Sequence, residues 1–108
     1  MEKNQIQNFE SLATSPLRQK ALEIINSGLT AVATEQVLKE NVTLEGNILT
    51  IKNNTFNLSE FNRLIFIGLG KAAGESALFF DKLLDSKISA GVVLDLKEVN
   101  CQYIKSYK

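Results

Sequence analysis

The chain has 108 residues, with 12 Lys and Arg, 12 Asp and Glu and no His, so its formal net charge at pH 7 is zero. This length predicts one small domain or part of a larger one, and the charge balance argues against a nucleic-acid-binding protein, which would carry a basic excess. Because His is absent and Cys101 is the one cysteine, the chain alone cannot build a Ser-His-Asp triad, a Cys-His pair, a histidine zinc site or an internal disulfide.

The sequence shows no sign of export or membrane insertion. Its longest apolar run, residues 64–69, has the length of a strand and falls short of the ~18 residues that a membrane span needs. Residues 1–5 have no apolar core and include Glu2, unlike a signal peptide. We therefore expect a cytoplasmic protein with no membrane partner and no nucleic-acid partner.

The first third of the chain has helical periodicity. Apolar side chains recur three apart over residues 6–12, which predicts a short amphipathic helix. Ser15 followed by Pro16 is a typical helix start, because Ser caps the free amides and Pro needs no hydrogen bond there. Behind this start, one helical face carries the apolar residues Leu17, Ala21, Ile24, Ile25, Leu29 and Val32.

A second helix is predicted directly after this one. Gly28 lies on the apolar face of the first helix, where it favours close packing against a neighbouring helix. Thr34 has the character of a helix cap, and residues 35–40 then form a short helix that we expect to be buried through Val37 and Leu38.

The middle of the chain changes to a β pattern. Short β-rich runs lie at residues 42–44, 48–51 and 55–58, and they are separated by the pairs Gly46-Asn47 and Asn53-Asn54. Such runs, broken by residues that favour turns, predict a β-hairpin or meander.

The last third predicts a βαβ unit. Residues 64–67 form a continuous apolar run, typical of a parallel strand that is covered on both faces. A glycine turn follows at residues 68–71, then a helix over residues 72–84 and a second buried strand at residues 90–94. The predicted fold class is therefore α/β, with N-terminal helices, a short β-hairpin or meander, and a Rossmann-like βαβ unit of a parallel sheet.

The glycine turn is the candidate binding site. In an open parallel sheet, ligands bind where the carboxyl end of a strand meets the N-terminus of the next helix. Gly68 and Gly70 would let the backbone amides of Gly68, Leu69, Gly70 and Ala72 approach an anion, and Lys71 would neutralise its charge. A lysine here opposes the helix dipole, which Glu75 would partly offset. The alternative is that Lys71 simply extends into solvent.

Three known phosphate-binding turns resemble this one in part. A Walker A loop is excluded, because Ile65 stands at its first glycine and Ala72 at its Ser or Thr. The dinucleotide fingerprint fits residues 68–73, with Asp95 at the end of the next strand as a candidate ribose ligand. Sugar-isomerase (SIS) domains share a Gly-x-Gly-Lys-Ser turn, although Ala72 lacks the hydroxyl.

A family resemblance extends over more of the chain, from about Leu12 to Leu94. The sequence resembles the glycerate 2-kinases that carry a C-terminal MOFRL domain. The similar segments are residues 12–18 and 21–24, Phe56-Asn57-Leu58, residues 63–73 with their Gly-x-Gly-Lys-Ala-Ala turn, and residues 90–93. Ala33 departs from the pattern, since that family often has an acidic residue there.

The resemblance implies an ATP-dependent kinase that phosphorylates D-glycerate at its 2-hydroxyl. Lys71 matches the catalytic lysine of that family, and Gly68 and Gly70 match the glycines of its ligand loop. Phosphoryl transfer depends mainly on positioning and charge neutralisation, which a lysine and turn amides supply. The implied cofactor is ATP with a divalent cation such as Mg²⁺, but no residue of this sequence is assigned as a metal ligand.

Enzymes of that family are several times longer than this chain. We therefore interpret residues 1–108 as a single, incomplete N-terminal α/β domain that is inactive alone, and whose sheet would be completed by self-association or by a partner chain. The alternative is a small Rossmann-like module that binds a dinucleotide or a sugar phosphate.

Overall fold

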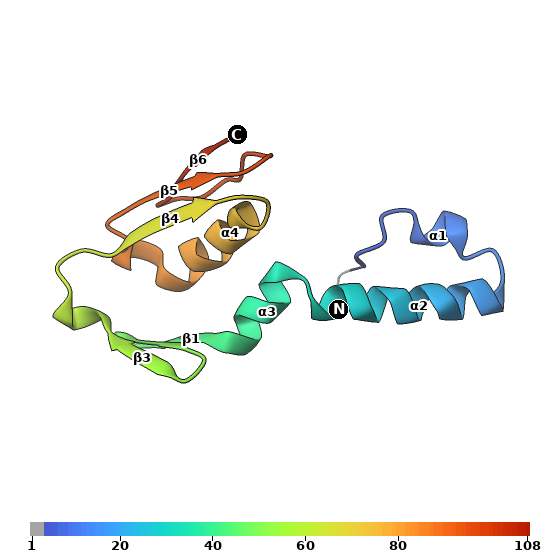
Figure 1. Ribbon diagram of the computed structural model, residues 1–108, viewed down its shortest axis with the longest axis horizontal. Helices are drawn as coiled ribbons and strands as arrows, with labels where there is room; N and C mark the ends of the chain where they lie inside the picture. The colour runs from blue at the N-terminus through green and yellow to red at the C-terminus, as the bar shows by residue number, and fades with distance from the viewer. Residues whose placement is uncertain (1–3) are drawn as a thin grey trace. The chain divides into compact units, whose positions relative to one another are not determined.

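A computed structural model of the chain describes residues 4–108 (Figure 1). Residues 1–3 lie outside that range, and they are part of the segment 1–5 that we expect not to be a signal peptide. The chain divides into two compact units, Met1–Val37 and Leu38–Lys108. The single domain expected over residues 1–108 stays a prediction.

The first unit contains helices α1 (Phe9–Leu12) and α2 (Pro16–Ala31), which confirms the predicted order. Helix α2 begins where expected, because the Ser15 side chain accepts a hydrogen bond from the Arg18 amide at 3.3 Å. No residue of α2 is buried. The close packing expected at Gly28 is wrong, since a Cβ there would meet no atom within 4 Å.

Helix α3 (Thr34–Asn41) follows and confirms the second predicted helix. Its expected burial is only partly correct. Leu38 packs against the hydrophobic core of the second unit, whereas Val37 is 41% exposed. A helix of this length presents a narrow face, so two adjacent residues cannot both point to the same core.

The second unit begins with an antiparallel meander, as predicted. Its strands are β1 (Val42–Glu45), β2 (Ile48–Ile51) and β3 (Asn54–Asn57), in the order β1-β2-β3. The turns use left-handed backbone at Gly46 and Lys52, with φ of 60° and 53°. Such turns are those that two-residue hairpin loops require.

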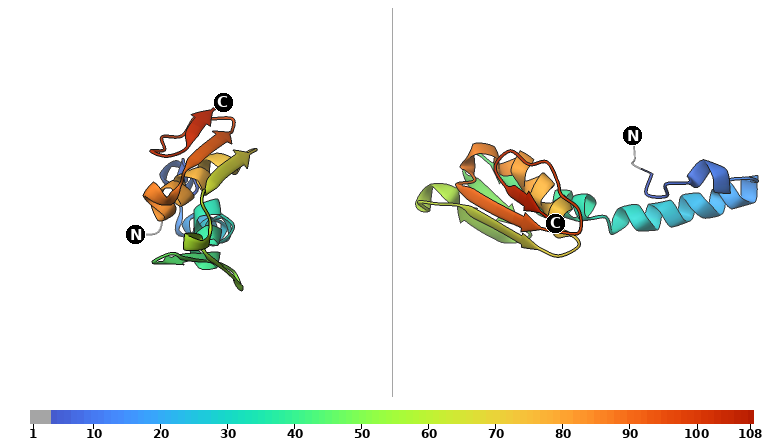
Figure 2. Two further views of the ribbon diagram at one scale, coloured as in Figure 1. Left: turned by 90° about the vertical axis from the view of Figure 1, so that its left-hand side faces the viewer. Right: turned by 90° about the horizontal axis from the view of Figure 1, so that it is seen from above.

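A parallel sheet forms the rest of this unit and confirms the α/β class with its βαβ unit. The strands lie in the order β4-β5-β6, and all are parallel. Figures 1 and 2 show helix α4 against this sheet, between β4 and β5 in the chain. Strand β6 was not predicted. The elements are η1 (Leu58–Glu60), β4 (Ile65–Leu69), α4 (Ala73–Leu84), η2 (Asp85–Lys87), β5 (Ala90–Leu94) and β6 (Lys105–Tyr107).

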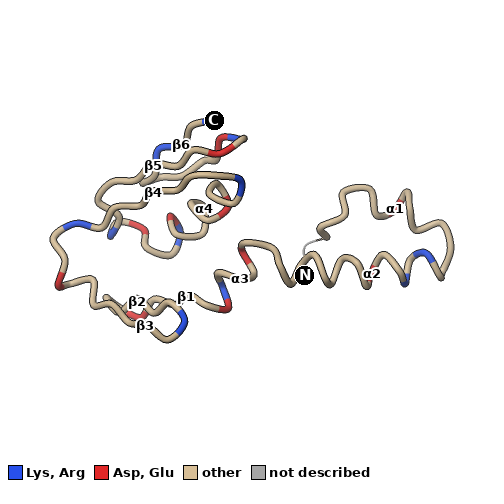
Figure 3. Tube along the Cα trace, in the orientation of Figure 1, with Lys and Arg blue, Asp and Glu red and all other residues tan. Residues whose placement is uncertain are grey.

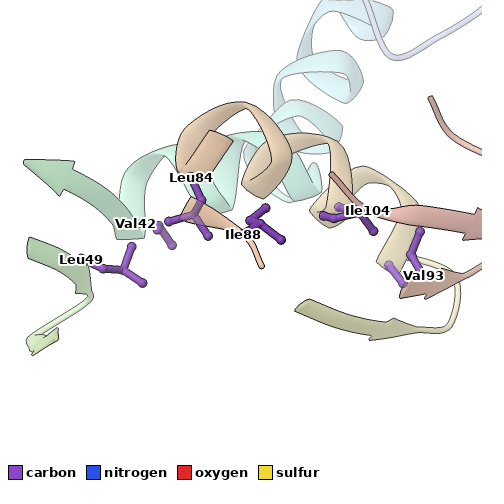
Figure 4. Close-up of a cluster of buried hydrophobic side chains, with 8 residues drawn as sticks. Val42, Leu49, Leu84, Ile88, Val93 and Ile104 are labelled. Carbon is purple, nitrogen blue, oxygen red and sulfur yellow. The ribbon is translucent and has the colours of Figure 1, made fainter. Parts of the chain in front are cut away.

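The core of the second unit joins both sheets through α4. Figure 4 shows Val42 and Leu49 of the meander near Leu84, the last residue of α4, and near Ile88, which follows the helix in the chain. Val93 of β5 is fully buried beneath the same helix. The small side chains of the helix let it lie close to the sheet, and the face predicted from Ala73, Ala77, Phe80 and Leu84 is the one that packs inward.

The expectation that β4 is covered on both faces is wrong for the described residues. Phe66 lies on the face toward α4, where its ring is 5.7 Å from that of Phe80. On the other face Ile65, Ile67 and Leu69 are 51%, 70% and 73% exposed. The reason is topological, because the one crossover helix of this unit can cover a single face.

Charged side chains of both signs are interspersed along the described chain, with no continuous basic stripe (Figure 3). Within residues 4–108, no helix has both the length and the apolar character required to cross a bilayer. The partners and the location expected from the sequence stay predictions.

Candidate functional site

The glycine turn lies at the carboxyl edge of the parallel sheet. Because all three strands of this sheet are parallel, Leu69, Leu94 and Tyr107 end at the same edge. The Gly70 amide donates to the Leu94 carbonyl at 3.0 Å, and the Asp95 amide donates to the Tyr107 carbonyl at 3.1 Å. The three strand ends are thus linked by hydrogen bonds just where the turn begins.

Glycine is required at positions 68 and 70 of the turn for two different structural reasons. At Gly68, a Cβ would lie 3.0 Å from the Phe66 ring, 3.2 Å from Val93 and 3.3 Å from the Cβ of Ala73, so a side chain would push α4 off the sheet. At Gly70, φ is +108°, a conformation that other residues rarely adopt. Gly68 therefore serves packing, and Gly70 sets the direction of the backbone.

Only some of the predicted amide donors remain free. The Gly70 amide donates to the Leu94 carbonyl, while Gly68 and Leu69 lie inside β4, an edge strand whose one neighbour in the sheet is β5. The amides of Lys71 and Ala72 donate to no described backbone or side-chain acceptor, and both residues are exposed. Just before α4, two adjacent amides are therefore available to an anion.

Lys71 stands beside these amides. Its side chain is exposed and forms no hydrogen bond or ion pair with any residue between positions 4 and 108. The compensating pair expected with Glu75 is absent. Helix α4 begins at Ala73, so Lys71 precedes the helix and the helical i, i+4 spacing does not apply to it.

Asp95 completes the first turn of α4, a role that the sequence analysis did not foresee. The N-cap residue Ala72 offers no side-chain acceptor, and Asp95 Oδ2 accepts from the Gly74 amide at 2.8 Å instead. A Cβ at Gly74 would lie 2.8 Å from that same oxygen, so only glycine admits the carboxylate. Its other oxygen accepts from the Leu96 amide. Ribose binding by Asp95 stays a prediction. A ribose would have to share this carboxylate with the amides of Gly74 and Leu96.

A second carboxylate, Asp81 of α4, fixes the segment that leads into β6. Asp81 is 9% exposed and accepts from the amides of Gln102 and Tyr103 at 2.9 and 2.8 Å. These bonds bridge more than 20 positions of sequence, which no periodic pattern reveals. They bring Ile104 into the core and β6 alongside β5.

The neighbourhood of Asp81 also affects two titratable side chains. Burial, and then the negative charge of Asp81, raise the pKa of the Cys101 thiol above its usual value. A hydrogen bond with Asp85, followed by burial and nearby carboxylates, raises the pKa of Tyr103. Cys101 is therefore less reactive than an ordinary thiol at neutral pH, which argues against a nucleophilic role.

Two cavities of the second unit lie away from the glycine turn. One of about 120 Å³ is bordered by Asn47, Leu58, Arg63 and Lys87 among others. The other, of about 440 Å³, follows residues 98–107. Among residues 4–108, no three Asp, Glu or Cys side chains are grouped in a way that could hold a metal ion.

Comparisons with known proteins agree with this architecture. No curated protein matches the chain. The crystal structure of the PH0495 protein from Pyrococcus horikoshii OT3 is similar, with a TM-score of 0.65 and 22% sequence identity over 86% of this chain. The chain spans 21% of the length of that protein, and at this identity the likeness shows the fold alone. Residues 20–108 match the family described as "Domain of unknown function (DUF4147)". The chain therefore belongs to the DUF4147 family.

Proposed function

We propose that the glycine turn at residues 68–72 is the phosphate-binding part of an ATP-dependent glycerate 2-kinase, which transfers a phosphoryl group from ATP to the 2-hydroxyl of D-glycerate. The observation that carries this proposal is the exposed Lys71 side chain next to two free amides at the carboxyl edge of a parallel sheet. The Gly-x-Gly-Lys-Ala-Ala sequence of the turn, which resembles that of the MOFRL-associated glycerate 2-kinases, gives it independent support.

The chemistry of the turn suits a phosphate group. The Lys71 and Ala72 amides would donate to phosphate oxygens, and the ammonium of Lys71 would neutralise their charge. Each charged hydrogen bond of this kind contributes about 1.5–3 kcal/mol. Asp95 already occupies the Gly74 amide, so the anion would be bound ahead of the helix, next to the lysine, and not on the first turn of α4.

Other parts of the reaction are not assigned to this chain. ATP brings a divalent cation, which would shield phosphate charge during transfer, but no acidic cluster among the described residues fits it. No residue is assigned to D-glycerate. We propose that the 108-residue chain binds the phosphate group of ATP but does not by itself catalyse phosphoryl transfer to D-glycerate.

Calorimetry with the 108-residue chain tests the proposal. We expect ATP with Mg²⁺ and inorganic phosphate to bind to the native chain, and the Lys71→Ala variant to lose at least about 10-fold in affinity, as the loss of one charged hydrogen bond requires. Lys20→Ala, which replaces an exposed lysine of α2, is the matched control and should bind as the native chain does.

Three outcomes would contradict parts of the proposal. Equal binding by Lys71→Ala and the native chain would remove the lysine from the site. Binding of NAD that ignores Lys71 would favour the dinucleotide alternative, in which Asp95 contacts the ribose. Formation of phosphoglycerate by the chain alone would refute its inactivity.

A further inference from the structure

We infer that Asp95 is a positioning residue of the glycine turn. Its carboxylate keeps a bound phosphate group off the N-terminus of α4 and confines that group to the amides of Lys71 and Ala72. The inference rests on the proposed function, because it concerns how the same turn holds its anion. It gives Asp95 a role in ligand binding in addition to its role as a cap of the helix.

The turn is attached to the end of β5 at two points. The Gly70 amide donates to the Leu94 carbonyl at 3.0 Å, and the Gly74 amide donates to Asp95 Oδ2 at 2.8 Å. Leu94 and Asp95 are adjacent in the chain, so the two attachments hold both ends of the turn against one strand end. The amides of residues 71–72 lie between them and donate to no acceptor within residues 4–108.

The carboxylate of Asp95 occupies the place where a helix would otherwise attract an external anion. Free amides and the helix dipole favour negative charge at a helix N-terminus. In α4 the Ala73 amide donates to the Gly70 carbonyl at 3.0 Å, and the Gly74 amide donates to Asp95. A Cβ at Gly74 would lie 2.8 Å from Asp95 Oδ2, so glycine at this position is what admits the carboxylate. An external phosphate group therefore cannot bind the Gly74 amide while Asp95 does.

The charge of Asp95 also acts on an anion that is bound ahead of the helix. Two residues of chain span at most about 7 Å, so the amide nitrogens of Ala72 and Gly74 lie no further apart than that. At an ionic strength of about 0.01 M the Debye length is about 30 Å, so the carboxylate repels a phosphate group on the Ala72 amide. The ammonium of Lys71 offsets this repulsion, which favours the phosphate group beside the lysine.

Two substitutions of Asp95 separate these effects when inorganic phosphate is titrated into the 108-residue chain and followed by nuclear magnetic resonance. In Asp95→Ala the Gly74 amide loses its acceptor, so its signal should shift together with those of Lys71 and Ala72. The affinity should rise by about 10-fold, as one added charged hydrogen bond requires. In Asp95→Asn the side-chain oxygen still accepts from Gly74, so the Gly74 signal should not shift. Loss of the charge should raise the affinity by about 2- to 5-fold at an ionic strength of about 0.01 M, and by less than about 2-fold at about 1 M.

Glu60→Gln is the matched control, because it makes the same change from carboxylate to amide. Glu60 of η1 is exposed and precedes β4, at the end of the strand opposite to the glycine turn, so the affinity should equal that of the native chain. A Gly74 signal that does not shift in Asp95→Ala, or an affinity in Asp95→Asn no higher than in Glu60→Gln, would overturn the inference while native binding leaves the proposed function intact. Absence of saturable binding by the native chain would contradict the proposed function, and the inference with it.

Discussion

Replacement of Asp95 should loosen the start of α4 by a calculable amount. Asp95→Ala leaves the Gly74 amide without its acceptor, and the loss of a helix cap costs about 0.5–2 kcal/mol. The loss of a negative charge at a helix N-terminus lowers the free energy of unfolding by a further amount of about 0.3–1 kcal/mol. We therefore expect the free energy of unfolding to fall by about 1.5 kcal/mol in Asp95→Ala. Asp95→Asn keeps one side-chain oxygen for the Gly74 amide but loses the charge and the acceptor of the exposed Leu96 amide, so the free energy of unfolding should fall by about 1 kcal/mol.

Thermal and urea unfolding followed by circular dichroism at pH 7 measure these differences. For a chain of this size, 1.5 kcal/mol corresponds to a melting temperature lower by roughly 6–12 °C. Glu98→Ala, which removes an exposed carboxylate of the same β5–β6 segment, is the control and should change stability by less than about 0.5 kcal/mol. Equal stability of Asp95→Ala and Glu98→Ala would refute the capping role of Asp95.

Three further predictions concern packing, backbone conformation and pH. Gly28→Ala should increase the helix content and stabilise α2 by about 1 kcal/mol, because the added Cβ meets open space. Gly70→Ala should lower the free energy of unfolding by about 1–3 kcal/mol, because φ at Gly70 is +108°. Circular dichroism and urea unfolding measure both changes, and a Gly28→Ala variant less stable than Gly70→Ala would contradict these roles of the two glycines. Val93→Ala removes two buried methyl groups from a side chain with 0% exposure and should lower the free energy of unfolding by about 2 kcal/mol, so a change under 0.5 kcal/mol would be inconsistent with this core. The pKa of Tyr103 is raised in the folded chain, chiefly by the hydrogen bond with Asp85, so the folded chain keeps the phenol proton to a higher pH than the unfolded chain does. The resulting stabilisation is complete below a pH of about 10 and is lost as pH rises through the folded-state pKa. Between pH 8 and 11, the free energy of unfolding measured in urea should therefore fall less steeply in Tyr103→Phe than in the native chain, and identical slopes would count against the hydrogen bond.

The sequence was sufficient for elements that rest on local signals. Ser15 and Pro16 mark the start of α2, and Gly46 marks a hairpin turn, because cap and turn preferences act within a few residues. The apolar runs on either side of the glycine turn predicted β4, α4 and β5 for the same reason. The candidate binding turn was found in this way too.

The rest depends on contacts between distant residues. Strand β6 is held beside β5 through Asp81, whose two amide partners lie more than 20 positions away, and its own three residues, Lys105–Tyr107, are too few to show a β pattern. The capping of α4 by Asp95 likewise joins residues 21 positions apart. The apolar run of β4 indicates what the strand can bury, but it does not say how many helices the chain provides to cover it.

Nuclear magnetic resonance of the 108-residue chain during titration with inorganic phosphate tests the central claim most directly. The account predicts that the amide signals of Lys71 and Ala72 shift most as phosphate binds, while the Gly74 amide, already bound to Asp95, shifts little. Absence of any saturable shift at Lys71 and Ala72, or a larger shift elsewhere in the chain, would contradict it.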